Sequence, residues 1–163
     1  MARVYVESSA YVKAFSAEKG SDYVRKIFDH ADRGKLEPIT SQWTVGESLA
    51  AVDRKYRRKE IKLDERDIIT ATIMDRTVAL VREGKMTMVY TKQDVVSSSW
   101  RLITERHLSA DDALHVFSAI VGLADMFISA DVYLLQAARQ VGFGSYNVES
   151  AEEFRKLVTK LNL

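Results

Sequence analysis

Alternating apolar and polar positions divide the chain into short strands and longer helices. Short apolar, β-branched or aromatic runs predict strands, whereas apolar residues spaced three and four apart predict helices. The pattern predicts strands over residues 4–6, 86–90, 126–129 and 143–148, and a connector or brief strand over residues 36–40. It predicts helices over residues 8–15, 20–34, 41–59, 64–84, 92–105, 109–122, 131–141 and 150–160. Strands that alternate with helices indicate a parallel or mostly parallel sheet covered on both faces.

The expected fold class is therefore α/β, a three-layer α/β/α sandwich with a mostly parallel central sheet of four or five strands. The chain has 163 residues, the size of one domain, and no repeat or Gly/Ser/Pro-rich linker divides it. We expect a single domain over residues 1–163. Several polar residues stand where helices should begin and suit the N-cap position: the Ser8-Ser9 pair, Ser41, Ser109, Asp131 and Ser150. Ser97–Ser99 weaken the prediction of a helix over residues 92–105, because serine is a poor residue inside a helix.

Composition excludes several kinds of chemistry. The chain has no cysteine, which rules out thiolate nucleophiles and zinc sites built on cysteine. Its three histidines, His30, His107 and His115, lack the close spacing of a metal-binding pair, so an imidazole-based zinc site is not expected. The net charge of +1 draws the protein to neither nucleic acid nor membrane as a whole. No segment approaches the ~20 apolar residues of a membrane span, and we expect a cytoplasmic protein.

Four acidic residues stand where either function or ordinary structure accounts for them. Glu7 directly follows the first predicted strand, and Asp131 lies two residues beyond the strand ending near Ser129. Sites in α/β sheets form outside the carboxyl ends of parallel strands. Glu47 lies within an apolar helix stripe, and Asp112 opens a helix whose apolar body should pack on the sheet. The ordinary alternatives are first-turn acids for Glu7 and Asp112, an N-cap for Asp131 and a solvated side chain for Glu47.

Taken together, four segments of the sequence resemble the PIN-domain family. They are residues 4–13 (VYVESSAYVK), 44–49 (TVGESL), 109–119 (SADDALHVFSA) and 124–134 (ADMFISADVYL). The resemblance follows the family's order over nearly the whole chain, and residues 111–134 are its most specific part. It implies a metal-dependent endoribonuclease, in many cases the toxin of a toxin–antitoxin pair, with an antitoxin protein as partner. It also implies that Glu7, Glu47, Asp112 and Asp131 form the catalytic and metal-binding set.

The physical case for a metal is independent of the resemblance. Converging carboxylates repel one another unless a cation compensates their charge. Mg²⁺ or Mn²⁺ suits oxygen ligands, and the bound ion would activate a water for in-line attack on phosphorus. The family usually has aspartate where this chain has Glu7, so either the metal is displaced by about an ångström, the length of one methylene, or the site is weakened or dead.

Several residues near the four acids receive secondary roles. Ser9 and Ser129 are candidates to orient the ligating carboxylates, although a helix cap or a strand end explains each equally well. His115 is assigned a packing role, because the family has a packing residue there and a lone histidine on an apolar helix is more often structural. Asp111 and Asp125 rank second as substitutes for their neighbours in the site.

For RNA contact, the strongest local basic run is residues 54–59, with Arg54, Arg57 and Arg58 as candidate phosphate-binding residues. Tyr56 or Trp43 offers a stacking face. A solvated helix end whose cations favour the C-terminal dipole explains the run at least as well.

Two rival functions and a partner surface complete the expectations. A catalytically weak or silent PIN-like binding module is supported by Glu7. A receiver-like or phosphatase-like domain is poorly supported, because residues 6–9 lack the paired acids of the one and the Asp-x-Asp of the other. Either a homodimer or an antitoxin contact would use apolar surface, with helix 64–84, Phe15, Phe28 and Trp43 as candidates for interface or core.

Overall fold

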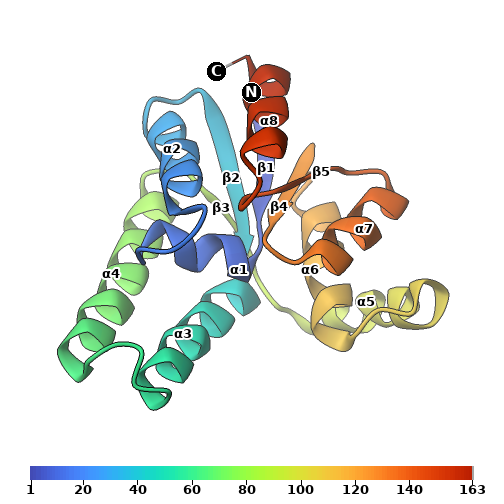
Figure 1. Ribbon diagram of the computed structural model, residues 1–163. Helices are drawn as coiled ribbons and strands as arrows, with labels where there is room; N and C mark the ends of the chain where they lie inside the picture. Colours follow the sequence, from blue (N-terminus) through green and yellow to red (C-terminus); the bar gives the residue numbers. More distant parts are fainter. Residues whose placement is uncertain (163) are drawn as a thin grey trace.

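The computed structural model describes residues 1–162, and within them five strands form one sheet in which every pairing is parallel (Figure 1). The strands are β1 (Ala2–Val6), β2 (Leu36–Ser41), β3 (Thr87–Val89), β4 (Met126–Ser129) and β5 (Gly144–Asn147). Their order across the sheet is β3-β2-β1-β4-β5, so β1 is the central strand with β2 and β4 on its two sides. The predicted α/β class and parallel sheet are confirmed.

Helices connect the strands and lie on both sides of the sheet (Figure 1). They are α1 (Ser8–Tyr11), the short 3₁₀ helix η1 (Val12–Ala14), α2 (Ser21–Asp32), α3 (Gln42–Arg57), α4 (Leu63–Arg82), α5 (Gln93–Arg106), α6 (Ala110–Val121), α7 (Val132–Val141) and α8 (Ala151–Leu161). The connected ends of α3 and α4 project away from the sheet (Figure 1). Over residues 1–162, no helix combines the length and the apolar character needed to cross a membrane.

Successive side chains of the inner strands feed two separate hydrophobic clusters. Val4 and Val6 of β1 belong to a cluster that includes residues of α2, α4 and α8, whereas Tyr5 belongs to a cluster with residues of α6 and α7. Strand β4 repeats the alternation, because Ile128 joins the first cluster and Phe127 the second. Side chains of a strand alternate between the two faces, so both faces are buried. The three-layer α/β/α arrangement is therefore confirmed.

The segment with the only proline is a full strand of the sheet and more than a connector. Strand β2 pairs with β1 from Leu36 to Ile39, but with β3 only from Ile39 onward. Proline lacks a backbone N–H and is normally excluded from inner strands. At Pro38, β2 has a partner strand on one side only, so the sheet tolerates a residue that cannot donate a hydrogen bond.

The first helix differs from the expected one. The helix predicted over residues 8–15 is split into one turn of α1 followed by η1. Its N-cap is Glu7, whose carboxylate oxygens accept from the backbone N of Ser9 at 3.0 Å, so the expected serine cap is wrong. The reason is that Glu7 has the extended backbone of a capping residue and a side chain long enough to curl back over the first turn.

A buried lysine joins three separate parts of the chain. Nζ of Lys13 lies 3.0 Å from Glu18 Oε2 and 2.8 Å from Glu149 Oε1, and its side chain is only 4% exposed. Lys55 on α3 lies 2.7 Å from the other oxygen of Glu18. Burial acts to raise the pKa of Glu18, but hydrogen bonds from Lys55, Ser16 and Lys13 outweigh it and lower the pKa to about 2. The network links η1, α3 and the loop before α8.

The apolar residues considered as interface candidates divide between core and surface. Phe28 is buried in the core, and Phe15 packs against the same cluster. Trp43 is 43% exposed. Helix α4 also exposes several apolar side chains: Leu63, Ile68, Met74 and Val78. Trp43 and the outer side of α4 therefore remain candidate contact surfaces.

Candidate functional site

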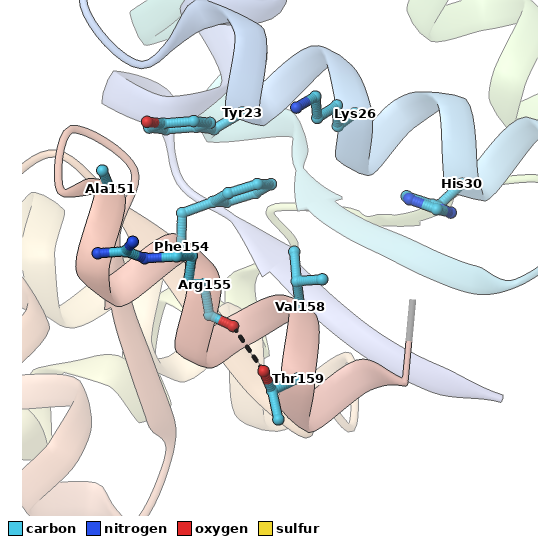
Figure 2. A pocket seen from close by; sticks show the side chains of 8 residues that line it. All are labelled: Tyr23, Lys26, His30, Ala151, Phe154, Arg155, Val158 and Thr159. Carbon is cyan, nitrogen blue, oxygen red and sulfur yellow. Dashed lines mark hydrogen bonds between the residues drawn. The ribbon is translucent and has the colours of Figure 1, made fainter.

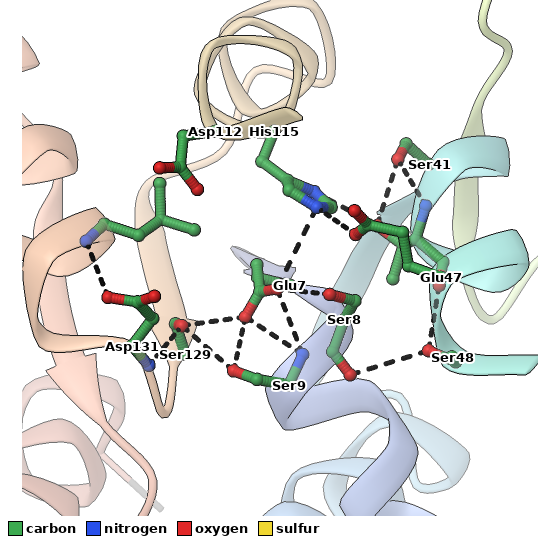
Figure 3. A network of polar contacts seen from close by, with 12 residues as sticks. Glu7, Ser8, Ser9, Ser41, Glu47, Ser48, Asp112, His115, Ser129 and Asp131 are labelled. Atoms are coloured by element: carbon green, nitrogen blue, oxygen red, sulfur yellow. Dashed lines mark hydrogen bonds and ion pairs between the residues drawn. The ribbon is translucent and has the colours of Figure 1, made fainter. Parts of the chain in front are cut away.

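The four acidic residues singled out in the sequence meet near the carboxyl-terminal edge of the sheet (Figure 3). Glu7 directly follows β1, and Asp131 lies between β4 and α7. Glu47 lies on the second turn of α3, and Asp112 on the first turn of α6. Because β1 and β4 are parallel neighbours, the residues that follow them lie at the same edge. Four segments distant in sequence thus bring their carboxylates to one region.

Glu7 is the most enclosed of the four acids, with 5% of its surface exposed. Its carboxylate accepts a hydrogen bond from Ser8 Oγ, and it accepts from the backbone N of Ser9 at 3.0 Å. It also accepts from Ser9 Oγ at 2.5 Å and from Ser129 Oγ at 2.7 Å. An ionised carboxylate has about four lone-pair sites, so these four donor groups engage the whole of it. The methylene by which glutamate exceeds aspartate is accommodated in this folded-back conformation.

Ser9 and Ser129, the serines expected beside the ligating carboxylates, connect Glu7 to the loop after β4. Their hydroxyl oxygens are 3.1 Å apart. Ser9 Oγ accepts from the backbone N of Ala130 at 2.8 Å, and Ser129 Oγ accepts from the backbone N of Asp131 at 2.9 Å. The positions of Glu7 and Asp131 are therefore coupled through two hydroxyl groups (Figure 3).

His115, for which the sequence predicts only a packing role, lies within the acidic group. Its Nε2 is 2.6 Å from Glu47 Oε2 and 3.9 Å from Glu7 Oε1, and its Nδ1 is 3.1 Å from the hydroxyl of Tyr5. The side chain is buried, in keeping with a structural residue, but its contacts are with the candidate site. A signal was present in the sequence, because His115 follows Asp112 by three residues and this spacing puts both on one face of a helix.

The contact between His115 and Glu47 changes the pKa of both groups. Burial opposes a charge on His115, but the neighbouring Tyr5 oxygen and the carboxylates of Glu47 and Glu7 raise its pKa to about 10. Burial acts to raise the pKa of Glu47, and the hydrogen bond from His115 outweighs it and lowers that pKa below its ordinary value. At neutral pH the two side chains therefore form an ion pair.

Asp112 and Asp131 form the more open side of the site. Oδ1 of Asp131 accepts from the backbone N of Tyr133 at 2.8 Å and of Leu134 at 3.1 Å, so Asp131 is also the N-cap of α7. Its Oδ2 accepts no hydrogen bond from the residues that the structure describes. Burial raises the pKa of Asp112, and the negative charges of Asp111 and Asp131 raise it further. The carboxylates of Asp112 and Asp131 are thus close enough to repel each other.

The two substitute acids occupy different places. Asp111 is exposed, and its negative charge acts to raise the pKa of Glu47, while the charge of His115 lowers the pKa of Asp111. Asp111 therefore lies at the rim of the site. Asp125 Oδ2 accepts from the backbone N of Arg3 at 2.7 Å, at the start of β1. Arg3 precedes Glu7 by four residues, which is about 13 Å of extended strand. Asp125 therefore lies at the opposite edge of the sheet.

The donor set fits a divalent cation. Glu7, Glu47 and His115 each offer one ligand atom, and these three atoms lie within 4.8 Å of one another. Carboxylate oxygens suit Mg²⁺ and Mn²⁺, and an imidazole nitrogen suits Mn²⁺ and other transition metals better than Mg²⁺. The group therefore holds two of the four carboxylates expected from the sequence, while Asp112 and Asp131 lie outside it. The imidazole of His115 can ligate a cation only after it loses its proton.

The basic run at the end of α3 is partly neutralised by acidic neighbours. Arg57 pairs with Asp53 at 2.9 Å, and Arg58 Nη1 lies 4.0 Å from Glu60. The ring of Tyr56 is covered by the guanidinium of Arg66, 4.8 Å from the ring centroid, so this stacking face is occupied. Arg54 is exposed to solvent.

Two cavities of about 580 Å³ differ in their relation to the acids. One lies between α2 and α8 and contains none of the candidate acids; Figure 2 shows its lining, which includes Tyr23, Lys26, His30, Phe154 and Arg155. The other lies against the first turns of α3, and Glu47 forms part of its wall. Of these two cavities, the second is the one that adjoins the candidate site.

Several solved structures share the fold of this chain. PAE2754 from Pyrobaculum aerophilum is 15% identical, with a TM-score of 0.66, over 99% of this chain and 90% of that chain. VapC20 from Mycobacterium tuberculosis, a sarcin-ricin loop cleaving toxin, is 12% identical, with a TM-score of 0.59, over 86% of this chain and 95% of that chain. VapBC2 from Rickettsia felis, bound to a promoter DNA fragment, is 14% identical, with a TM-score of 0.57, over 90% of this chain and 98% of that chain. No family model and no curated protein sequence matches the chain.

Proposed function

We propose that this chain, which has the PIN-domain fold, is a divalent-metal-dependent ribonuclease that hydrolyses phosphodiester bonds in RNA. The convergence of Glu7, Glu47, Asp112 and Asp131 at one edge of the sheet carries the proposal. Like charges drawn from four segments repel one another, and a divalent cation offsets that repulsion. The fold of VapC20, a sarcin-ricin loop cleaving toxin, agrees with a cleavage activity.

In the proposed site each side chain has a distinct task. Glu47 would hold Mg²⁺ or Mn²⁺ together with Asp112 and Asp131, which lie outside the group of Glu7, Glu47 and His115 on the more open side of the site. Glu7 contributes a fourth negative charge at the buried end. When bound, the cation lowers the pKa of a water molecule and stabilises charge on the phosphate. Ser9 and Ser129 hold Glu7 in place through the hydrogen bonds described above.

The proposed partners are an RNA substrate, an antitoxin protein and a second copy of the chain. Arg54, Arg57 and Arg58 are the proposed phosphate contacts, and Arg54 is exposed to solvent. A protein partner is supported by the likeness in fold to VapBC2. The exposed apolar side chains of α4 offer a surface for such a partner or for a second copy.

Cleavage assays with a matched pair of variants test the proposal. Structured and unstructured RNAs are incubated with wild type in Mn²⁺, in Mg²⁺ and in EDTA, and with the variants in Mn²⁺. Asp112→Asn should abolish metal-dependent cleavage, whereas Asp125→Asn, which changes an exposed acid at the opposite edge of the sheet, should not. A folded wild-type protein that cleaves none of these RNAs with either metal would contradict the proposal.

A catalytically weak or silent binding module is a second candidate, and a specific observation favours it. The four donor groups on the Glu7 carboxylate leave it no lone pair for a cation unless a serine moves away. In that case Glu7 serves as the cap of α1 and as the anchor of the β1–β4 edge, and the remaining carboxylates hold a metal without efficient cleavage.

A further inference from the structure

The cavity beside Glu47 combines a flat aromatic side chain with polar groups. Its volume of about 580 Å³ lies within the ~300–1,000 Å³ of small-molecule pockets. The lining residues come from the first turns of α3 and from the segment after β3: Gln42, Trp43, Gly46, Glu47, Ala50 and Thr91. The cavity therefore shares one wall with the proposed metal site.

Gly46 lies in the wall of this cavity with open space beside it. A Cβ atom placed on Gly46 would have no neighbouring atom within 4 Å. The backbone there does not require glycine, because Gly46 is not among the residues with positive φ. Inside a helix, glycine is less favourable than alanine. A larger side chain at this position would take up open space at the cavity wall.

Trp43 offers an exposed aromatic face to an occupant, and Thr91 has an enclosed hydroxyl beside the cavity. Trp43 is 43% exposed, so much of its indole is free for a contact. The Oγ1 atom of Thr91 is buried and has no hydrogen-bond partner among the described residues. Buried polar atoms are normally paired. The hydroxyl is enclosed, so it reaches an occupant of the cavity only after the Thr91 side chain rotates.

We infer that this cavity binds one unpaired nucleobase of the RNA substrate, stacked on Trp43. A nucleobase is flat, aromatic and uncharged, which matches the indole and avoids the repulsion that the Glu47 carboxylate exerts on an anion. Splayed bases of single-stranded RNA stack on aromatic side chains in this way. The inference rests on the proposed function, because a base held here brings its attached phosphodiester toward the acids that include Glu47.

Tryptophan fluorescence tests the stacking directly. The chain has two tryptophans, so Trp100→Phe leaves Trp43 as the one indole. This variant is titrated in EDTA with a short unpaired RNA and with an abasic RNA of equal length and charge. The RNA with bases should quench the fluorescence of Trp43, and the abasic RNA should not. Equal quenching by the two would overturn the inference.

Binding of labelled RNA by cavity variants provides the second measurement. Trp43→Leu and Gly46→Leu should each weaken binding roughly 5- to 150-fold, the range found for loss of one base–aromatic stack. Trp43→Phe should retain most of the affinity, because it keeps an aromatic face. Trp100→Leu, which removes the other exposed indole, is the matched control and should bind like wild type. Thermal unfolding verifies the fold of each variant. Gly46→Leu should not weaken α3, because leucine is a better helix former than glycine.

The outcomes separate the cavity from the proposed function. If wild type cleaves RNA and Gly46→Leu binds and cleaves it with unchanged KM, the inference is overturned while the ribonuclease stands. If no metal supports cleavage, but base-dependent quenching occurs and Gly46→Leu abolishes binding, the ribonuclease fails and the nucleobase site stands.

Discussion

The imidazole of His115 holds the carboxylate of Glu47, with Nε2 and Oε2 2.6 Å apart. On its other side, Nδ1 of His115 is 3.1 Å from the hydroxyl of Tyr5, which donates to Ser41 Oγ at 3.2 Å. Ser41 caps α3, the helix that carries Glu47. The chain of hydrogen bonds thus runs from Ser41 through Tyr5 and His115 to the carboxylate of Glu47. The orientation of Glu47 therefore depends on β1, α6 and α3.

His115→Leu should weaken Mn²⁺ binding about tenfold or more, as is typical when the partner of a metal ligand is lost. His115→Gln, which keeps an N–H group for Glu47, should lose less. Isothermal titration calorimetry measures both, and circular dichroism verifies the fold. Unchanged Mn²⁺ affinity in His115→Leu would show that His115 does not position Glu47. Direct coupling of a nitrogen to Mn²⁺ in electron spin-echo spectra would instead make His115 a ligand.

Glu7→Asp should free the first carboxylate from part of its hydrogen bonding. Aspartate is a good N-cap and retains the bond to the backbone of Ser9, but its shorter side chain reaches Ser129 less well. We expect the metal-free protein to lose about 1 kcal/mol of unfolding free energy, the usual value of one hydrogen bond, and Mn²⁺ to bind more tightly. Urea unfolding in EDTA and calorimetry measure the two effects. If Glu7→Asp cleaves RNA and wild type does not, the result favours wild type as a catalytically silent module.

Asp112→Asn should stabilise the metal-free protein and remove its stabilisation by metal. The raised pKa of Asp112 means that its charge is unfavourable in the folded state, so neutralising it should stabilise the folded protein at pH 7. Wild type should gain about 2.7 kcal/mol when Mn²⁺ is at 100 times its dissociation constant. Thermal unfolding in EDTA and in Mn²⁺ measures both. If Asp112→Asn is less stable than wild type in EDTA, the result contradicts charge repulsion at Asp112.

Glu18 should make the fold sensitive to acid. Its pKa is lowered from 4.5 to about 2 in the folded protein, so its contribution is present above pH 4.5 and is lost as pH falls toward 2. After allowance for partial exposure, Glu18→Gln should cost about 2 kcal/mol at pH 7 and almost nothing near pH 2. Urea unfolding across this range measures the difference. Glu152→Gln, which breaks an exposed pair with Lys156, should change little at any pH.

Arg54→Glu combined with Arg58→Glu should weaken RNA binding and reduce its dependence on salt. Each lost phosphate contact lowers the slope of log affinity against log salt by roughly one. Arg57 is left in place because it pairs with Asp53. Fluorescence anisotropy at several salt concentrations measures the slope. The control is Arg155→Glu with Lys156→Glu on α8, and an equal loss there would point to overall charge rather than to α3.

Much of the fold follows from periodicity, because strands and helices buried on a defined face leave a clear pattern. The apolar run of Val4, Tyr5 and Val6 predicts a short strand, and the structure has a strand there. Residues 36–40 were less clear, since a proline lowers the prediction of a strand. Only the register shows that β3 pairs with β2 from Ile39 onward. Pro38 therefore faces no partner strand on that side, and a proline is compatible with the strand.

The candidate site was predictable in part. The position of Glu7 and Asp131 after parallel strands indicates that they lie at one edge, and the structure brings Glu47 and Asp112 to the same region. The conformation of Glu7 was not predictable, because it depends on Ser129, which is far away in sequence. The contact of His115 with Glu47 is not predicted, because the sequence of an apolar helix does not show which of its residues contacts a neighbouring helix.

The hydroxyl pair of Ser9 and Ser129 joins residues that are 120 positions apart. Synthesis proceeds from the N-terminus, so a nascent polypeptide carries Glu7 and Glu47 long before Asp112, Ser129 and Asp131 leave the ribosome. An interrupted translation product that ends before β4 lacks both the distal hydroxyl and the last carboxylate. Assembly of the site is therefore a late event in biogenesis, and truncated fragments remain without it.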